Sequence, residues 1–284
     1  MTAIIKGSIK DESAIAMLTI DGDPVLLTQG TFQKKLFVQP GGQIVEIIAI
    51  DKHANRSSAT VQLKRSSITV AAKKIAPLDP RKINAKLNPD AVALIIGVEE
   101  YENTFIAMFA GKDAQLFNDF AHKAFGVPQY HIKLLMNNEA ERNDTLKTIT
   151  TWLPQVIKEH KTDFYLFFSG HGLASSDGKD LFLLPYDGDP EILEYSALMR
   201  NDIFQKISDL NPRSVTVFLD TCYSGVSRSN EMLLAAKPIF IEVAKQEIPN
   251  NFTVFSASAN NEIASVLKEA GHGLFSYFLM KGLE

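Results

Sequence analysis

The sequence predicts a protein of two parts, in which an α/β domain with a mostly parallel sheet flanked by helices follows a small all-β sandwich. Three observations lead to this fold class: short alternating strands up to residue 65, a proline-containing stretch after it, and apolar strands that alternate with helical patterns from residue 91. The 284 residues suffice for two domains of ordinary size. We therefore expect domains at residues 1–65 and 91–284, joined by a linker at 66–90.

The first 65 residues carry the signals of an all-β sandwich. Apolar and other residues alternate over 14–20, and strong turn sequences occur at 21–22 (DG) and 40–42 (PGG). The segment GTFQKKLFVQPGGQIVEIIAIDKHANRSSATVQL resembles bacterial immunoglobulin-like (Ig-like) domains, in which a strand ends in an A-x-D-x-x-x-N turn. Ala49, Asp51 and Asn55 match this turn, although Ala54 stands where glycine is usual. The resemblance implies an Ig-like module.

The linker has three prolines, several basic residues and little periodicity. Beyond it, the patterns predict strands at 91–98, 131–136, 163–170, 214–225 and 251–258, and helices at 111–125, 144–160, 196–210 and 273–283. All-apolar strands that alternate with helices indicate a parallel sheet covered on both faces.

Composition excludes several classes of function. The net charge of −4 and the isoelectric point near 5.9 give no basic surface for nucleic acid or an anionic membrane, whereas cationic substrates stay open. No apolar run approaches the roughly 20 residues of a membrane span. The single cysteine, Cys222, excludes an internal disulfide and a cysteine-based zinc cluster. The start of the sequence lacks the pattern of a secretory signal.

Polar residues follow two of the predicted strands, in FYLFFSGHG (164–172) and VTVFLDTCYSG (215–225). In an extended chain, residues i and i+2 point to the same side, so Ser169 should share a side with His171, and Asp220 with Cys222. Ligands of open α/β sheets bind at the carboxyl ends of the strands. Two adjacent strand ends would therefore bring a thiol, an imidazole, a carboxylate and a hydroxyl together.

A cysteine and a histidine held together suit nucleophilic attack on an acyl carbon. The imidazole would protonate the leaving group, and backbone N–H groups near Gly172 and Cys222 would hold the oxyanion. Taken singly, each residue has a plainer interpretation, because a lone cysteine usually packs in a core and a histidine at a strand end is more often structural. Their spacing of 222 − 171 = 51 residues favours the catalytic interpretation, since the caspase pattern places the histidine about 50 residues upstream of the cysteine.

Residues 91–283 resemble the caspase-like cysteine peptidases, and the metacaspase and bacterial branch more closely than animal caspases. Six segments carry the resemblance, in the order and spacing of the family: ALIIGVEEY, GKDAQLF, FFSGHG, LFLLPYDGD, FLDTCYSG and HGLFSYFLMKGL. The resemblance implies a caspase-like fold in which Cys222 is the nucleophile and His171 the general acid and base.

The resemblance also implies a specificity. Animal caspases carry Gln-Ala-Cys at the nucleophile, whereas Asp220 stands two residues before the thiol here. The metacaspase-like branch has an acidic S1 pocket, and the matching positions are Asp220, Asp113 and Ser169. Carboxylates favour a guanidinium or ammonium side chain, so we expect cleavage of peptides after Arg or Lys. Asp113 has an alternative as a plain helix N-terminal carboxylate.

Weaker candidates complete the set. Glu262 is a lesser pocket candidate, and His272 competes for the role of base but precedes a helix and is better explained as structural. Asp187 and Asp189 are typical of a turn. The branch includes calcium-activated members, but two carboxylates are too few to predict a calcium site, so we expect neither metal nor cofactor.

Two rival functions were open on the sequence. One is a catalytically inactive caspase-like scaffold that binds partner proteins. The other is a hydrolase that uses Ser169 or Ser224 as its nucleophile, although the sequence has no Gly-x-Ser-x-Gly elbow around either serine. For the peptidase we expect peptide or protein substrates and favour a monomer. We expect a bacterial protein, cytoplasmic as the sequence stands or exported if a signal preceded it.

Overall fold

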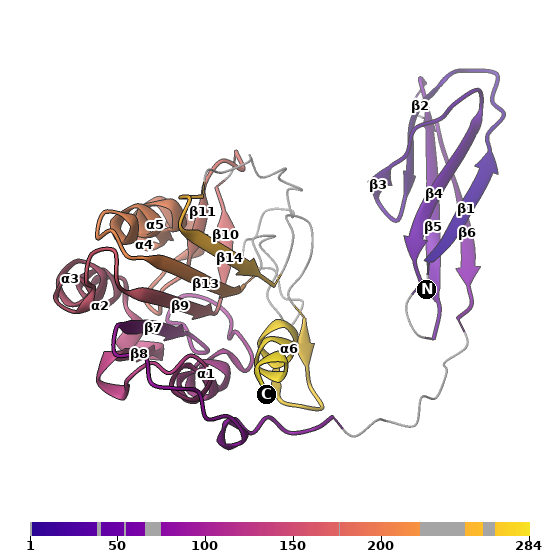
Figure 1. The fold of residues 1–284 in the computed structure, drawn as a ribbon. Helices are drawn as coiled ribbons and strands as arrows, with labels where there is room; N and C mark the ends of the chain where they lie inside the picture. The colour runs from indigo at the N-terminus through magenta and orange to yellow at the C-terminus, as the bar shows by residue number, and fades with distance from the viewer. Residues whose placement is uncertain are drawn as a thin grey trace. The chain divides into compact units, whose positions relative to one another are not determined.

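The computed structural model describes residues 2–38, 41–53, 55–65, 75–175, 177–221, 248–257 and 265–284. The chain divides into two compact units, Met1–Lys74 and Ile75–Glu284 (Figure 1). Each unit has its own apolar core. Among the helices of these ranges, none is both long and apolar enough to span a bilayer.

The first unit consists of antiparallel strands in two sheets. One sheet pairs β1 (Thr2–Ser8) with β4 (Thr31–Phe37), and the other has the order β3 (Asp23–Pro24), β2 (Ile15–Ile20), β5 (Gln43–Asp51), β6 (Arg56–Leu63). Buried side chains from both sheets form one cluster, which contains Ile5, Leu18, Ile20, Phe32 and Val45. The prediction of an all-β N-terminal region is confirmed.

Two turns of this unit follow directly from their residues. Asp21 and Gly22 both have positive φ, 52° and 82°, as the tight hairpin between β2 and β3 requires. At the end of β5, Asp51 Oδ1 accepts hydrogen bonds from the backbone N–H groups of His53 and Asn55, each at 2.8 Å, and Oδ2 accepts from the Asn55 side chain. The hydrogen bond from the Asn55 side chain is the main reason that the pKa of Asp51 lies below its usual value.

The second unit is built on a five-stranded parallel sheet. Its strand order is β14 (Phe252–Ser256), β13 (Ser214–Asp220), β9 (Asp163–Ser169), β7 (Ala91–Gly97), β8 (Ile132–Met136). The predicted strands begin within one residue of the observed ones, and the predicted strand 214–225 extends past Asp220 into residues outside the described ranges. The continuous apolar runs of β7, β9 and β13 lie in the middle of the sheet and are almost entirely buried.

Helices cover both faces of this sheet (Figure 1). On one face, α1 (Ala110–Ala124) and α6 (Leu274–Leu283) pack over alternate strand residues such as Ile95, Phe167 and Phe218. The cluster on the opposite face contains residues of α2 (Arg142–Lys147), α3 (Leu153–Val156) and α5 (Arg200–Ser208).

Two predicted helices are shorter or divided in the structure. The helix expected at 144–160 ends at Val156 and passes through a π-helical turn, Thr148–Trp152, just before Pro154, which has no N–H to continue an α-helical pattern. The helix expected at 196–210 is divided into α4 (Leu193–Ser196) and α5, because β12 (Leu198–Met199) pairs with β11 (Leu181–Leu183) instead.

Short elements complete the second unit. They are β10 (Gly172–Ala174), which pairs with β11, the hairpin of β15 (Val266–Leu267) and β16 (His272–Gly273), and the 3-10 turns Pro80–Lys82, Gln129–His131, Asn137–Ala140 and Pro190–Ile192. Residues 75–90, the larger part of the predicted linker, belong to the second unit: Leu78 and Ile83 pack on the α1 and α6 cluster.

Candidate active site

Three neighbouring strands end in register at one edge of the parallel sheet. Gly97 of β7 aligns with Ser169 of β9, and Ser169 aligns with Asp220 of β13. Residues in register on parallel strands point to the same face, and the residues two positions earlier belong to the cluster under α1 and α6. Ser169 and Asp220, which are both fully buried, therefore lie side by side on that face.

The ends of β9 and β13 are also linked beyond the ladder. The backbone N–H of Gly170 donates a hydrogen bond to the carbonyl of Asp220 at 3.3 Å. His171 follows Gly170 directly, and Thr221, fully buried, follows Asp220. The histidine-bearing turn is thus attached to the strand that leads to residue 222.

His171 is fully buried and held from one side by the connection between β7 and α1. Its ring stacks on Tyr101 with centroids 4.8 Å apart and an interplanar angle of 29°. Its backbone N–H donates to the hydroxyl oxygen of Tyr101 at 2.7 Å, and ring Nε2 lies 2.9 Å from the carbonyl oxygen of Phe105. Because a carbonyl only accepts, Nε2 carries hydrogen, and Nδ1 is the basic nitrogen of the neutral ring.

Sequence reasoning missed both residues of that connection. A backbone carbonyl, as at Phe105, leaves no signal in a sequence, since every residue has one. Tyr101 lies within one of the recognised segments, ALIIGVEEY, but its contact with a residue 70 positions later is not a local pattern. The glycine before the histidine has a steric reason here, because a Cβ at Gly170 would lie 2.6 Å from the Tyr101 hydroxyl oxygen.

Asp220 is bound by the first turns of α6. Its Oδ2 accepts hydrogen bonds from the backbone N–H of Ser276, at 3.2 Å, and from the Ser276 hydroxyl. A buried carboxylate needs such donors, and the N-terminal part of a helix favours negative charge. Ser276 was not predicted; the only sequence signal is a polar residue within the apolar pattern of HGLFSYFLMKGL.

Asp113 lies in the first turn of α1 and is also fully buried. Its Oδ1 is 2.6 Å from His272 Nδ1, and its Oδ2 accepts the backbone N–H of Gly273 at 2.8 Å. A carboxylate is acceptor-only when ionised, so Nδ1 of His272 is the donor. The sequence predicts a structural role for His272 rather than the role of general base. In the structure, His272 contacts Asp113, one of the two predicted pocket acids.

The other candidates divide into placed and unplaced residues. Gly172, the predicted oxyanion residue, begins β10 and is aligned with Leu183 of β11. Cys222, Ser224 and Glu262 lie outside the described residues, so the nucleophile stays a prediction.

The two carboxylates of PYDGD serve a turn. Asp187 Oδ1 accepts the backbone N–H of Arg142 at 2.7 Å, and Asp189 caps a 3-10 turn by accepting the N–H of Glu191 at 2.9 Å. Within the ranges that the structure describes, no three His, Cys, Asp or Glu residues gather as a metal site would require.

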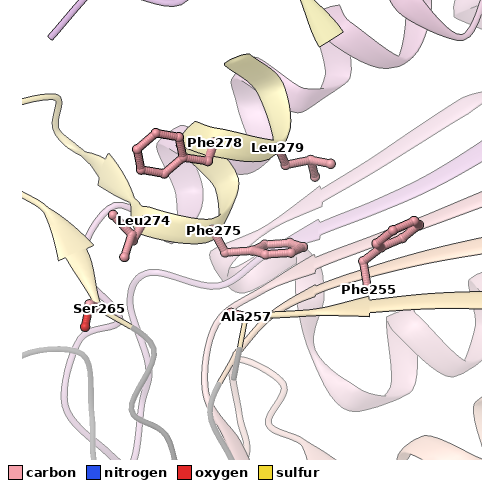
Figure 2. Close-up of a pocket in the computed structure, with 7 residues that line it drawn as sticks. All are labelled: Phe255, Ala257, Ser265, Leu274, Phe275, Phe278 and Leu279. Carbon is pink, nitrogen blue, oxygen red and sulfur yellow. The ribbon is translucent and has the colours of Figure 1, made fainter. Parts of the chain in front are cut away.

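An open apolar pocket of about 680 Å³ lies between β14 and α6. Figure 2 shows its lining side chains, which are Phe255, Ala257, Ser265, Leu274, Phe275, Phe278 and Leu279. None of these side chains is titratable. The pocket therefore differs in chemistry from the site that contains the buried side chains of Asp113, Asp220, His171 and His272.

Comparisons with known proteins give one informative match. No curated protein matches the chain. A crystal structure of a Geobacter sulfurreducens protein is 18% identical over 68% of this chain and 81% of that one, with a TM-score of 0.49. A 2,6-sialyltransferase from Photobacterium is 8% identical over 76% of this chain and 39% of that one, with a TM-score of 0.22. Similarities this low carry no argument about function.

The family comparison is of a different quality. The model of the family described as "Caspase domain" matches residues 90–284, which include the whole parallel sheet, α1, α6 and the turn that carries His171. The match covers more than half of the chain. The chain therefore belongs to the caspase-domain family of cysteine peptidases.

Proposed function

We propose that the chain is an active cysteine endopeptidase of the metacaspase-like branch that cleaves peptides after Arg or Lys. The observation that carries this proposal is the pair of fully buried carboxylates, Asp113 and Asp220, which meet the same end of α6 through Gly273 and Ser276. One buried acid at the end of β13 and one in the first turn of α1 would form a site of negative charge in a low dielectric. A guanidinium is its natural complement by charge and by its planar array of donors.

The geometry of His171 suits the role of general acid and base. With Nε2 donating to Phe105 O, the nitrogen that exchanges a proton is Nδ1. In the proposed reaction the Cys222 thiolate attacks the carbonyl carbon of the P1 residue, and backbone N–H groups of Gly172 and Cys222 stabilise the oxyanion. Imidazolium Nδ1–H then protonates the departing amine, and the neutral ring takes a proton from the water that hydrolyses the thioester.

Chain connectivity supports Cys222 as the partner of His171. Residue 222 follows Asp220 by two residues, so its Cα lies within about 8 Å of the Asp220 Cα. Gly170, the neighbour of His171, is hydrogen-bonded to that same aspartate.

The test is a library of fluorogenic tetrapeptides varied at P1, assayed with and without millimolar calcium. We expect arginyl peptides to be cleaved best, lysyl peptides less well, because an ammonium cannot make the planar two-point contact, and aspartyl peptides not at all. Cys222→Ala should abolish turnover. Asp220→Asn should lower kcat/KM for arginyl peptides by a factor that corresponds to a loss of about 2 to 4 kcal/mol in transition-state binding.

The matched control is Asp119→Asn, which removes an exposed carboxylate from the same helix as Asp113. It should leave cleavage unchanged. Preference for P1 Asp would refute the acidic pocket while leaving Cys222 and His171 in place. Complete absence of cleavage in the folded wild-type protein would favour the inactive scaffold instead.

For the first unit we propose an Ig-like module. Two antiparallel sheets around one core and the Asp51 turn support it, in addition to the sequence resemblance. Such a module would bind a partner or act as a spacer, and its removal should not abolish cleavage of small peptides.

A further inference from the structure

One short segment, from His272 to Ser276, binds both buried acids of the proposed S1 pocket. His272 and Gly273 donate to Asp113, and Ser276 donates to Asp220. The segment joins β16 to the first turns of α6, so it belongs to neither of the strands that carry the proposed catalytic residues.

The His272–Asp113 contact, like the hydroxyl contact of Ser276 with Asp220, joins two side chains. Both are buried, His272 with 6% and Asp113 with 0% of its surface exposed, and the donor and acceptor atoms are 2.6 Å apart. A charge-assisted hydrogen bond of this length, away from water, fixes the orientation of both groups. Asp113 also accepts from Gly273 N–H, so two donors on adjacent residues define the plane of its carboxylate.

We propose that His272 is a positioning residue for substrate specificity: it orients the Asp113 carboxylate to receive the P1 cation. This inference rests on the proposed function, because it deepens the account of the same S1 pocket. An ionised carboxylate accepts about four hydrogen bonds, so binding His272 and Gly273 is compatible with binding a guanidinium N–H as well. Without the His272 donor, the Asp113 carboxylate would lose a hydrogen bond that fixes its orientation towards the cation.

The neighbours of His272 do not supply that role. Lys112 of α1 is directed to the carbonyl of Ala270 at 3.4 Å, and the ring of Tyr277 lies 6.3 Å from the His272 ring, centroid to centroid. His272 and Gly273, in contrast, both hydrogen-bond directly to the Asp113 carboxylate.

The experiment compares His272→Leu, which removes the donor, with His272→Asn, whose amide NH₂ occupies roughly the place of Nδ1–H. The control is His122→Leu, which removes a histidine near the far end of the same helix, where Nδ1 contacts the carbonyl of Val127 at 2.8 Å. For arginyl peptides we expect His272→Leu to raise KM at least about tenfold with kcat changed less than about threefold. His272→Asn should restore most of the affinity, and His122→Leu should behave as wild type.

Two readouts separate positioning from a merely structural role. Alkylation of Cys222 by iodoacetamide needs no P1 side chain, so its rate should be the same in wild type and His272→Leu. In a double-mutant cycle of His272→Leu and Asp113→Asn, the double variant should have a KM for arginyl peptides no higher than that of the more impaired single variant, because His272 acts through Asp113. Equal losses in alkylation and in arginyl cleavage, additive effects in the cycle, or an unchanged KM would each overturn the proposal.

Binding alone distinguishes this inference from the proposed function. Arginine amide is titrated calorimetrically into Cys222→Ala protein, with and without His272→Leu. Binding that weakens at least about tenfold with His272→Leu supports the inference even where wild-type protein shows no turnover, an outcome that counts only against the peptidase proposal. Absence of binding in the parent protein, or binding indifferent to His272, overturns the inference even where arginyl peptides are cleaved.

Discussion

At the scale of single residues, the site depends on how tightly His171 is held. The Tyr101 ring stacks on the imidazole, and the Tyr101 hydroxyl oxygen accepts the His171 backbone N–H. The ring contact and the hydroxyl contact are separable by substitution. A stacked aromatic face restricts ring rotation and stabilises an imidazolium, whereas the hydroxyl satisfies a buried donor.

We expect Tyr101→Phe and Tyr101→Leu to differ. Tyr101→Phe keeps the ring but leaves the buried N–H of His171 without this acceptor, which should lower the free energy of unfolding by about 1 to 3 kcal/mol. Tyr101→Leu also loses the stacking and should lower kcat/KM a further tenfold or so, since a misplaced general acid transfers protons poorly. The measurements are urea unfolding and kcat/KM across pH, with the exposed Tyr195→Phe as control. Identical pH profiles in both Tyr101 variants would argue against a role for stacking.

Gly170 offers a second, more local prediction. A Cβ at this position would lie 2.6 Å from the Tyr101 hydroxyl oxygen and 3.1 Å from the Phe168 ring. Gly170→Ala should therefore displace Tyr101 and reduce kcat/KM by about tenfold. In the double variant with Tyr101→Phe, the loss of kcat/KM, expressed as a free energy, should be clearly smaller than the sum of the two single losses. The reason is that the Tyr101 hydroxyl oxygen, the atom closest to the new Cβ, is then absent. Strict additivity in this cycle would show that Tyr101 is not what excludes a side chain at 170.

At the scale of elements, the sequence predicted what is local and missed what is long-range. The strands β7, β9 and β13 were predictable because each is a continuous apolar run, and the alignment of Ser169 with Asp220 follows once two such strands are neighbours. The helix expected at 144–160 was overestimated, because the π-helical turn before Pro154 and the end at Val156 reflect backbone geometry rather than periodicity. The donors to the acids, His272 and Ser276, lie more than 50 residues from their acceptors, so no spacing rule finds them.

The β5–β6 turn gives a pH prediction for the first unit. Hydrogen bonds from Asn55 and Ser13 lower the pKa of Asp51 in the folded state. A carboxyl with a lowered folded pKa stabilises the fold above its unfolded pKa of about 3.9, and this stabilisation is lost as the pH falls through the lower folded pKa. We expect amide exchange in β5 and β6 to accelerate below about pH 4, beyond the intrinsic change of exchange rate with pH. Asp51→Asn should remove this extra step at low pH, whereas the exposed Glu12→Gln should retain it.

At the scale of the whole molecule, the chain is two units with separate cores. Residues 75–90 are integrated into the second unit. Tyr277 of α6 donates its hydroxyl hydrogen to the carbonyl oxygen of Ala76 at 2.8 Å, and the backbone N–H of Ala85 donates to the carbonyl oxygen of Lys123 at 2.9 Å.

This integration predicts where the peptidase unit must begin in order to be stable. A protein of residues 75–284 should cleave arginyl peptides like the full chain, since it keeps both clusters and all described site residues. A protein of residues 91–284 loses the half-buried side chains of Leu78 and Ile83 and the hydrogen bonds to α1 and α6, and should be about 3 to 5 kcal/mol less stable. Urea unfolding of the two proteins, followed through Trp152, gives the comparison directly. Leu78→Ala in the 75–284 protein should show an intermediate loss, because it removes apolar contact and leaves the backbone hydrogen bonds in place. Equal stability of the 75–284 and 91–284 proteins would mean that residues 75–90 contribute nothing to the unit that they contact.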